Sequence, residues 1–256
     1  MGKSVKVVDN FDLPMERSGP VGVGRGSEDV TTDDMVIPRL QIIQDLSPQH
    51  KKTKDEYIEG AEVRMVFNTA TNELYGDSLL VVPVFYCKEY VIWRDQNEGG
   101  GFRGAFSTEA EANAKLATLE DKDLCEVVAT NQQFVLVVDP SSSLDAPRAD
   151  GAVISMSISQ NKVSRKWNTM IAQAGGDRFE CMYKLDVVET SNDAGQEYYN
   201  WKVTRKGYIE GTALYAMAEK FYEAISSGAA DISRDTGSST PSPEVHEGEV
   251  EEESEF

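Results

Sequence analysis

The chain has 256 residues and a mass of 28.3 kDa, and 40% of its residues are hydrophobic, enough for one large domain or two small ones. Its formal net charge of −19 and pI near 4.5 exclude general adhesion to nucleic acids or anionic membranes, so a site for a polyanion has to be local. No segment offers the roughly 18 apolar residues that span a bilayer, and residues 1–10 contain no apolar run of a secretory signal. We therefore expect a protein of the cytoplasm without membrane contact.

Composition divides the chain into three parts. Residues 1–34 are rich in Gly, Ser and Asp and have no periodicity that could bury a face, which is typical of a flexible N-terminal arm. Residues 35–226 carry recurring apolar patterns and form the expected folded body. Residues 227–256 are rich first in Ser, Thr and Pro and then in Glu, so we predict a disordered acidic C-terminal tail.

The body begins with strand patterns. Residues 62–70 and 78–93 are dense in Val, Leu, Phe and Tyr, and the turn-prone sequence TNELYGD separates them. This arrangement predicts a hairpin of the two segments. Further strands of the same kind are predicted at residues 125–139, 151–159, 179–191 and 197–208.

The last two of these strands are separated by SNDAGQ, a Gly-containing hairpin loop, and antiparallel pairing follows from it. Helix signals occur at residues 107–119, which open with a Ser or Thr cap, at 161–174, which end at Gly175, and at 211–225. The body is therefore predicted to be mainly β with a few helices. Five or six strands, one interposed helix and a covering C-terminal helix suit an OB-fold-like antiparallel β-barrel with insertions, and an open sheet fits the same pattern.

The side chains required for most enzyme chemistry are missing. The two histidines, His50 and His246, lie in a lysine-rich stretch and in the acidic tail, so no histidine dyad or triad can be assembled. No GxxxxGK[ST] phosphate loop occurs, and the glycine runs GVGRG and GGGFRG are predicted to be flexible loops. Cys87, Cys125 and Cys181 are far apart among apolar neighbours, which favours buried thiols. We expect no catalytic residues, no metal and no cofactor, and a metal-dependent nuclease is the least supported alternative.

Aromatic residues alternate with cations in two segments of the body, a pattern that suits single-stranded nucleic acid. Exposed bases stack on aromatic rings at about 1 to 3 kcal/mol each, and Lys and Arg neutralise phosphates. A third basic group follows His50. The predicted nucleic-acid-binding residues are Lys162, Arg165, Lys166, Trp167, Tyr198, Lys202, Arg205, Lys206, Tyr208, Lys51, Lys52 and Lys54.

Strand alternation separates two faces of residues 197–208. Tyr199, Trp201 and Val203 fall on one face, which we assign to the core, whereas Tyr198 and Lys202 fall on the other and are the better binding candidates. The alternative for any one of these rings is that it fills the core while the cations solvate the surface. A similar group of Tyr and Lys residues occurs in FYCKEYVIWR, where a buried strand with charged ends would give the same pattern.

The chain ends in EVEEESEF, which places an aromatic ring and a carboxylate on Phe256 behind Glu251, Glu252, Glu253 and Glu255. This tail resembles those of single-stranded-DNA-binding proteins of bacteria and of tailed bacteriophages, in which the last ring enters a pocket on partner proteins. It departs from the bacterial pattern, which has Pro before the final Phe and more Asp, and is closer to the phage version. IPRLQIIQ and SRKWN in the body are similar to sequences in phage replication proteins.

The resemblance implies a non-enzymatic phage protein that coats single-stranded DNA in the host cytoplasm during replication or recombination. It implies that the acidic tail recruits a polymerase, a helicase-primase or a recombinase. A homo-oligomer of this chain is among the expected states. The tail carries nine acidic residues and one basic residue, which leaves a net charge of −11 on the rest of the chain, so we expect moderate, salt-dependent DNA binding. The alternative is a virion or host-takeover protein that acts through protein contacts or DNA mimicry.

Overall fold

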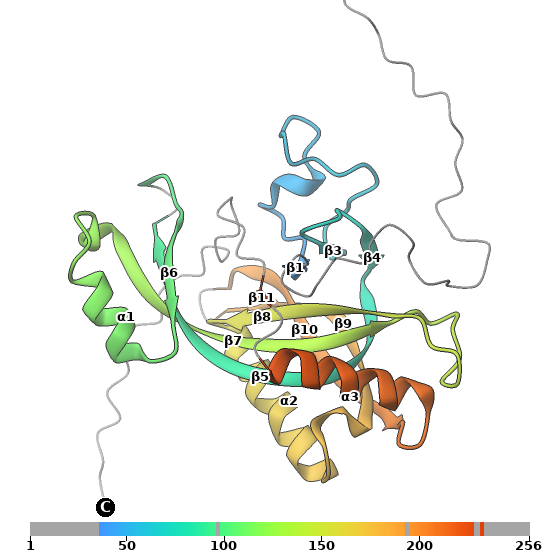
Figure 1. Cartoon of the computed structure of the whole chain (residues 1–256). Helices are drawn as coiled ribbons and strands as arrows, with labels where there is room; N and C mark the ends of the chain where they lie inside the picture. The colour runs from blue at the N-terminus through green and yellow to red at the C-terminus, as the bar shows by residue number, and fades with distance from the viewer. Residues whose placement is uncertain (1–35, 96–97, 193–194, 228–230, 233–256) are drawn as a thin grey trace, which may run out of the picture.

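The computed structural model describes residues 36–95, 98–192, 195–227 and 231–232 (Figure 1). The largest sheet is antiparallel and has the strand order β10-β9-β5-β7-β8, with β6 paired to the far end of β5. The mainly β architecture with a few helices, predicted from the sequence, is confirmed. The strands of this sheet are β5 (Ser78–Arg94), β6 (Phe102–Phe106), β7 (Cys125–Val138), β8 (Ala149–Ser157), β9 (Cys181–Ser191) and β10 (Glu197–Tyr208).

Strand β5 is the centre of the sheet. It pairs with β7 along nearly its whole length, and on its other edge it pairs with β9 over residues 78–81 and with β6 over residues 90–93. A register shift between Pro83 and Phe85 interrupts the pairing with β7. Proline has no amide hydrogen to donate, and such a bulge adds twist to a long strand. One end of β5 therefore belongs to the curved body of the protein, and the other forms an arm with β6 and β7.

The predicted hairpin of residues 62–70 with 78–93 is wrong. Strand β3 (Val66–Asn68) pairs with β4 (Leu74–Gly76), which lies inside the predicted turn, and with β2 (Leu40–Ile42). The side-chain oxygen of Asn68 accepts hydrogen bonds from the amides of residues 70 and 71, so the chain turns earlier than expected. The GGGFRG segment also differs from the prediction, because its last residues belong to β6.

All three predicted helices are present: α1 (Glu109–Leu116), α2 (Gln160–Ala174) and α3 (Ala213–Ser226). Thr108 and Glu111 form a capping box at the start of α1. Helix α2 ends at Gly175, whose φ of 76° suits a residue without a Cβ atom. No helix among the described residues is long and apolar enough to cross a membrane. The short 3-10 helices are η2 (Pro48–His50), η4 (Lys122–Leu124) and η5 (Arg178–Glu180).

The sheet curves, but it does not close into a barrel among the described residues, because its edge strands β8 and β10 do not pair with each other. Helix α2 packs against β8, β7 and β10. The segment after β1 (Val36–Ile37) also reaches both edges: the carbonyl of Pro38 accepts a hydrogen bond from the amide of Val153 in β8, and the Gln44 side chain exchanges two with the main chain of Tyr199 in β10. Helix and segment thus span the gap that a barrel would close.

Between these elements lies the interior cluster of buried apolar side chains. Trp167 lies in this cluster and is 0% exposed. Its ring meets that of Tyr183 edge-on, with the ring centroids 5.9 Å apart. Cys181 also belongs to the cluster, whereas Cys87 and Cys125 are only partly buried, contrary to the sequence prediction. The cluster consists of Leu40, Ile42, Val66, Leu79, Val81, Val135, Val137, Ala152, Ile154, Met156, Trp167, Ile171, Cys181, Tyr183, Leu185, Val187, Trp201 and Val203.

The opposite face of the sheet forms a second core with α3. Leu214, Ala218 and Ile225 of this helix pack on the side chains of β5, β7 and β8 that point away from the interior cluster, such as Phe134 and Leu136. After α3, β11 (Asp231–Ile232) pairs in parallel with β1, so two residues of the segment predicted as tail belong to a strand. The predicted N-terminal arm lies outside the described residues, as does the predicted tail apart from Ser227, which caps α3, and the two residues of β11.

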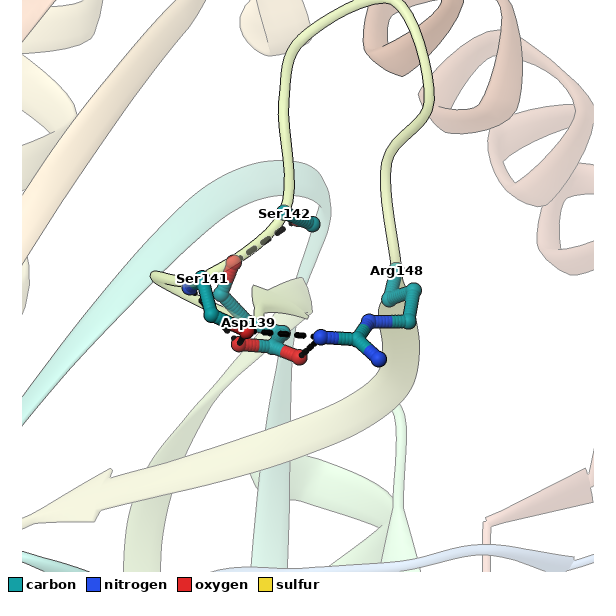
Figure 2. A network of polar contacts seen from close by, with 4 residues as sticks. All are labelled: Asp139, Ser141, Ser142 and Arg148. Atoms are coloured by element: carbon teal, nitrogen blue, oxygen red, sulfur yellow. Dashed lines mark hydrogen bonds and ion pairs between the residues drawn. The ribbon is translucent and has the colours of Figure 1, made fainter. Parts of the chain in front are cut away.

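The loop between β7 and β8 is fixed by the polar network in Figure 2. Asp139 accepts hydrogen bonds from the amide and hydroxyl of Ser141 at 2.8 and 2.7 Å and forms an ion pair with Arg148 at 2.6 Å. These hydrogen bonds, followed by the Arg148 charge, lower the pKa of Asp139. The network explains how a polar loop of the sequence SSSLDAPR keeps the two strands in register.

Replacing Trp167 with Ala should lower the free energy of unfolding by about 3 to 5 kcal/mol, because it leaves a large cavity at the centre of the interior cluster. The neighbouring Lys166→Ala is the matched control. Lys166 is exposed on the same helix, so its loss should change stability by no more than about 0.5 kcal/mol. Urea unfolding of both variants measures the difference, and equal midpoints would contradict the core assignment of this tryptophan.

Candidate nucleic-acid interface

The predicted cations of α2 lie on the solvent face of this helix. Ser164, Trp167 and Ile171 form its buried face, and Lys162, Arg165 and Lys166 are exposed on the other side. The prediction that Trp167 stacks on bases is wrong for this structure, because a fully buried ring offers no face to a ligand. The helix therefore contributes charge to a candidate site, and its aromatic ring contributes packing.

Strand β10 has the two faces that alternation predicts. Trp201 and Val203 are buried in the interior cluster, and Tyr199 packs against it. Lys202 is exposed on the opposite face, and Tyr198 is half-buried there. The acidic residue across from Lys202 is Asp186, which forms an ion pair with Lys184 at 2.6 Å. The hairpin also carries Glu189 and Glu197, so its three acids face Lys184 and the three β10 cations.

The end of β10 meets the end of α2. The hydroxyl of Tyr208 donates a hydrogen bond of 3.2 Å to the carbonyl of Ala174, the last residue of α2. Its ring is 56% exposed, and the Arg205 guanidinium lies 5.7 Å from the ring centroid. Lys206 is exposed beside them. An exposed ring with a cation above it has the composition that single-strand binding needs.

The cations of α2 and β10 thus lie on two elements that pack together. They do not all share one face, because Tyr198 and Lys202 lie on the outer face of β10, whereas Arg205 and Tyr208 are paired with Tyr183 and Cys181 of the interior cluster. We call this set the α2–β10 surface, and it consists of Lys162, Arg165, Lys166, Tyr198, Lys202, Arg205, Lys206 and Tyr208.

The third predicted basic group is not brought to this surface. Lys52 and Lys54 are exposed, and the ammonium of Lys51 donates a hydrogen bond of 3.0 Å to the carbonyl of Leu46. In Figure 1 their segment, drawn in blue after β2, lies above the sheet in the view, whereas α2 lies below it. The structure therefore separates these three lysines from the cations of α2, although Gln44 of the same segment is hydrogen-bonded to Tyr199 in β10.

A polar network near α2 was not predicted from the sequence. Arg178 of η5 donates hydrogen bonds to the side-chain oxygens of Gln133 and Asn168, and its guanidinium lies 5.4 Å from the ring centroid of Tyr86. Gln133 also donates to Ser164 at 2.9 Å. The only sequence signal was the polar run NQQ, followed in strand β7 by five apolar residues, and nothing in the sequence connected it with an arginine 45 residues away.

The guanidinium of Arg178 forms no ion pair with any carboxylate in the described part of the chain. Burial lowers the pKa of Arg178 to about 10, so it remains charged at neutral pH. Burial likewise raises the pKa of the neighbouring Tyr183 to about 12, which keeps this phenol neutral. The result is a partly buried positive charge held by neutral oxygens.

Comparison with models of known protein families gives a match. The family described as Pam3 phage gp34-like protein matches residues 14–231, which include every element described above except the last residue of β11. No curated protein and no solved structure matches the chain. Because the match extends over most of the sequence, the chain belongs to the Pam3 phage gp34-like protein family and is a bacteriophage protein.

Proposed function

We propose that this protein binds and coats single-stranded DNA during phage replication or recombination. The observation that carries the proposal is the α2–β10 surface, where an acidic chain exposes cations on two elements that pack together and holds Arg205 beside the exposed ring of Tyr208. Such cations neutralise DNA phosphates and thereby release the counterions condensed on the DNA. Bases stack on such rings whatever the sequence of the DNA. Both contributions are what a protein that coats any single strand needs.

The connectivity of the sheet supports the same proposal. Strand β5 pairs with β7 and β9, β8 continues the sheet beyond β7, and α2 precedes the hairpin of β9 and β10. This is the strand order of an oligonucleotide-binding barrel opened between its third and fifth strands. The gap between β8 and β10 corresponds to that opening, and α2 lies across it.

Helix α3 covers part of the face on which oligonucleotide-binding barrels commonly bind DNA. Oligonucleotide-binding barrels commonly use the outer face of their second and third strands, which correspond to β7 and β8 here. In this protein α3 packs on part of that face, so Phe134 and Leu136 are buried beneath it. The α2–β10 surface has no such cover among the described residues, which favours it as the contact for DNA.

Neutralising the α2 cations tests this assignment. The triple variant Lys162→Gln, Arg165→Gln and Lys166→Gln should weaken binding to an unstructured thymidine oligonucleotide. It should also reduce the slope of log affinity against log salt by about 2, since each lost phosphate contact removes about 0.7. Fluorescence anisotropy across a salt series measures both quantities.

The matched control for this experiment removes three exposed cations elsewhere: Lys115→Gln in α1, Lys122→Gln in η4 and Lys220→Gln in α3. It changes the net charge equally and should leave the slope near that of the unmodified protein. Equal loss in both triples would mean that net charge alone governs binding. If the unmodified protein does not bind single-stranded DNA, the proposal is refuted and the virion or host-takeover alternative gains support. Cleavage of the oligonucleotide with magnesium would instead indicate a nuclease.

We further propose that the acidic segment recruits a phage replication protein, namely a polymerase, a helicase-primase or a recombinase. The segment lies outside the described residues, and the proposal rests on its sequence. An aromatic ring among carboxylates suits a partner pocket with an apolar floor and a basic rim. The same carboxylates repel DNA phosphates or compete for the cations of the α2–β10 surface.

Replacing Phe256 with Ala should separate these two roles. The charge of the segment is unchanged, so affinity for single strands should hardly move. Capture of the partner should weaken about 30-fold or more, since loss of an interface anchor costs about 2 kcal/mol or more. Deletion of residues 249–256 is the comparison variant, and it should also raise DNA affinity. Pull-down from infected cells with each protein checks this, and equal recovery of partners would refute a role for the ring.

A further inference from the structure

We propose that one face of the arm formed by β5 and β7 is a second contact surface for single-stranded DNA, carried by Tyr86, Lys88 and Tyr90. The inference rests on the proposed function and extends it, because the α2–β10 surface does not include this arm.

The register places the three side chains on one face. Tyr86 is paired with Gln133, Lys88 with Asn131 and Tyr90 with Ala129. Directly paired residues of antiparallel strands share a face, and alternate residues of one strand follow at about 6.6 to 6.8 Å. The face is the one that carries Val135 in the interior cluster, so it is the continuation of the interior surface beyond the apolar core.

The β5 and β7 positions of this face carry no acidic residue in a protein whose net charge is −19, although Asp121, just before η4, forms an ion pair with Arg94 at its far end. Along β5 the positions after the bulge are Tyr86, Lys88, Tyr90, Ile92 and Arg94, and their partners in β7 are Gln133, Asn131, Ala129, Val127 and Cys125. The acidic side chains of these strands, Glu89 and Glu126, belong to the opposite face. A polyanion lying on the first face therefore meets no carboxylate of either strand.

Two cations lie over the two tyrosine rings. The ammonium of Lys88 is 4.9 Å from the ring centroid of Tyr90, and the guanidinium of Arg178 is 5.4 Å from that of Tyr86. Lys88 is exposed and both tyrosines are half-buried. Neither ring belongs to an apolar cluster of the described residues. At such a site the cation can bind the phosphate of a nucleotide, and the accessible aromatic ring can contact its base.

The face is continuous with the first residues of α2. The hydroxyl of Tyr86 donates a hydrogen bond of 2.7 Å to Asn131, and Asn131 contacts the side chain of Asn161 at 2.5 Å. Asn161 directly precedes Lys162, where the cations of the α2–β10 surface begin. A DNA strand bound along α2 can therefore continue onto β5 over a protein surface whose charge favours phosphate.

The test uses the full chain and a long thymidine oligonucleotide. Lys88→Gln should lower the salt slope by about 0.7, and Tyr90→Leu should weaken binding about 5- to 100-fold, because it removes a stacking ring. Tyr90→Phe restores the ring and should restore the affinity, whereas a purely structural role for the hydroxyl would not give this rescue. Lys220→Gln in α3 controls for the loss of one exposed charge.

Photocrosslinking gives a readout that does not depend on how Tyr90→Leu folds. The unmodified protein is irradiated with an oligonucleotide that contains 5-iodouracil, and adducts are located by mass spectrometry. We expect adducts on Tyr86 or Tyr90. If the protein binds DNA but gives no adduct there and Lys88→Gln behaves like Lys220→Gln, this inference is overturned and the proposed function stands. If the unmodified protein binds no single strand, both are overturned.

Discussion

The two free edges of the curved sheet are the constraint on which the rest of the structure depends. A six-stranded sheet that curves around Trp167 but does not pair β8 with β10 leaves two rows of backbone groups that need partners and an apolar interior that needs a cover. Helix α2 covers the interior, and the segment from Pro38 to Gln44 supplies hydrogen bonds to both edges.

This arrangement also determines where positive charge can gather. Because α2 turns its apolar stripe into the interior cluster, its cations must face solvent. A protein with a net charge of −19 can attract a polyanion only where its cations outnumber the acids locally. Packing the helix across the open side of the sheet produces such a place without any change in overall charge.

Several features could be predicted because they depend on local periodicity. The alternation of β10 placed Trp201 in the core and Lys202 in solvent, and the caps at Thr108 and Gly175 bounded their helices. Trp167 was misread because it was grouped with its charged neighbours. The helical spacing of Ser164, Trp167 and Ile171 already placed this ring on the buried face.

Other features could not be read from the sequence because they join residues far apart along the chain. The hydrogen bonds of Gln44 with Tyr199 span 155 residues, and no periodicity indicates that a glutamine would act as the partner of a strand edge. The position of β4 inside a turn-prone segment depended on a single side chain, that of Asn68. Closure of the gap between β8 and β10 is likewise a tertiary event, which local propensity does not determine.

The buried polar run of β7 is the feature that connects stability with the proposed binding. Asn131, Gln132 and Gln133 are all buried in the middle of a sheet, where apolar side chains would cost less to desolvate. Gln133 and Asn131 are hydrogen-bonded to Arg178, Ser164 and Tyr86, so this cost is largely offset, and the strand changes there from core to accessible face. A continuous apolar strand would have buried the arm against another element. The polar run instead holds a charged guanidinium and a tyrosine at the point where the interior surface becomes accessible, which is where a single strand passing from α2 to β5 would need them.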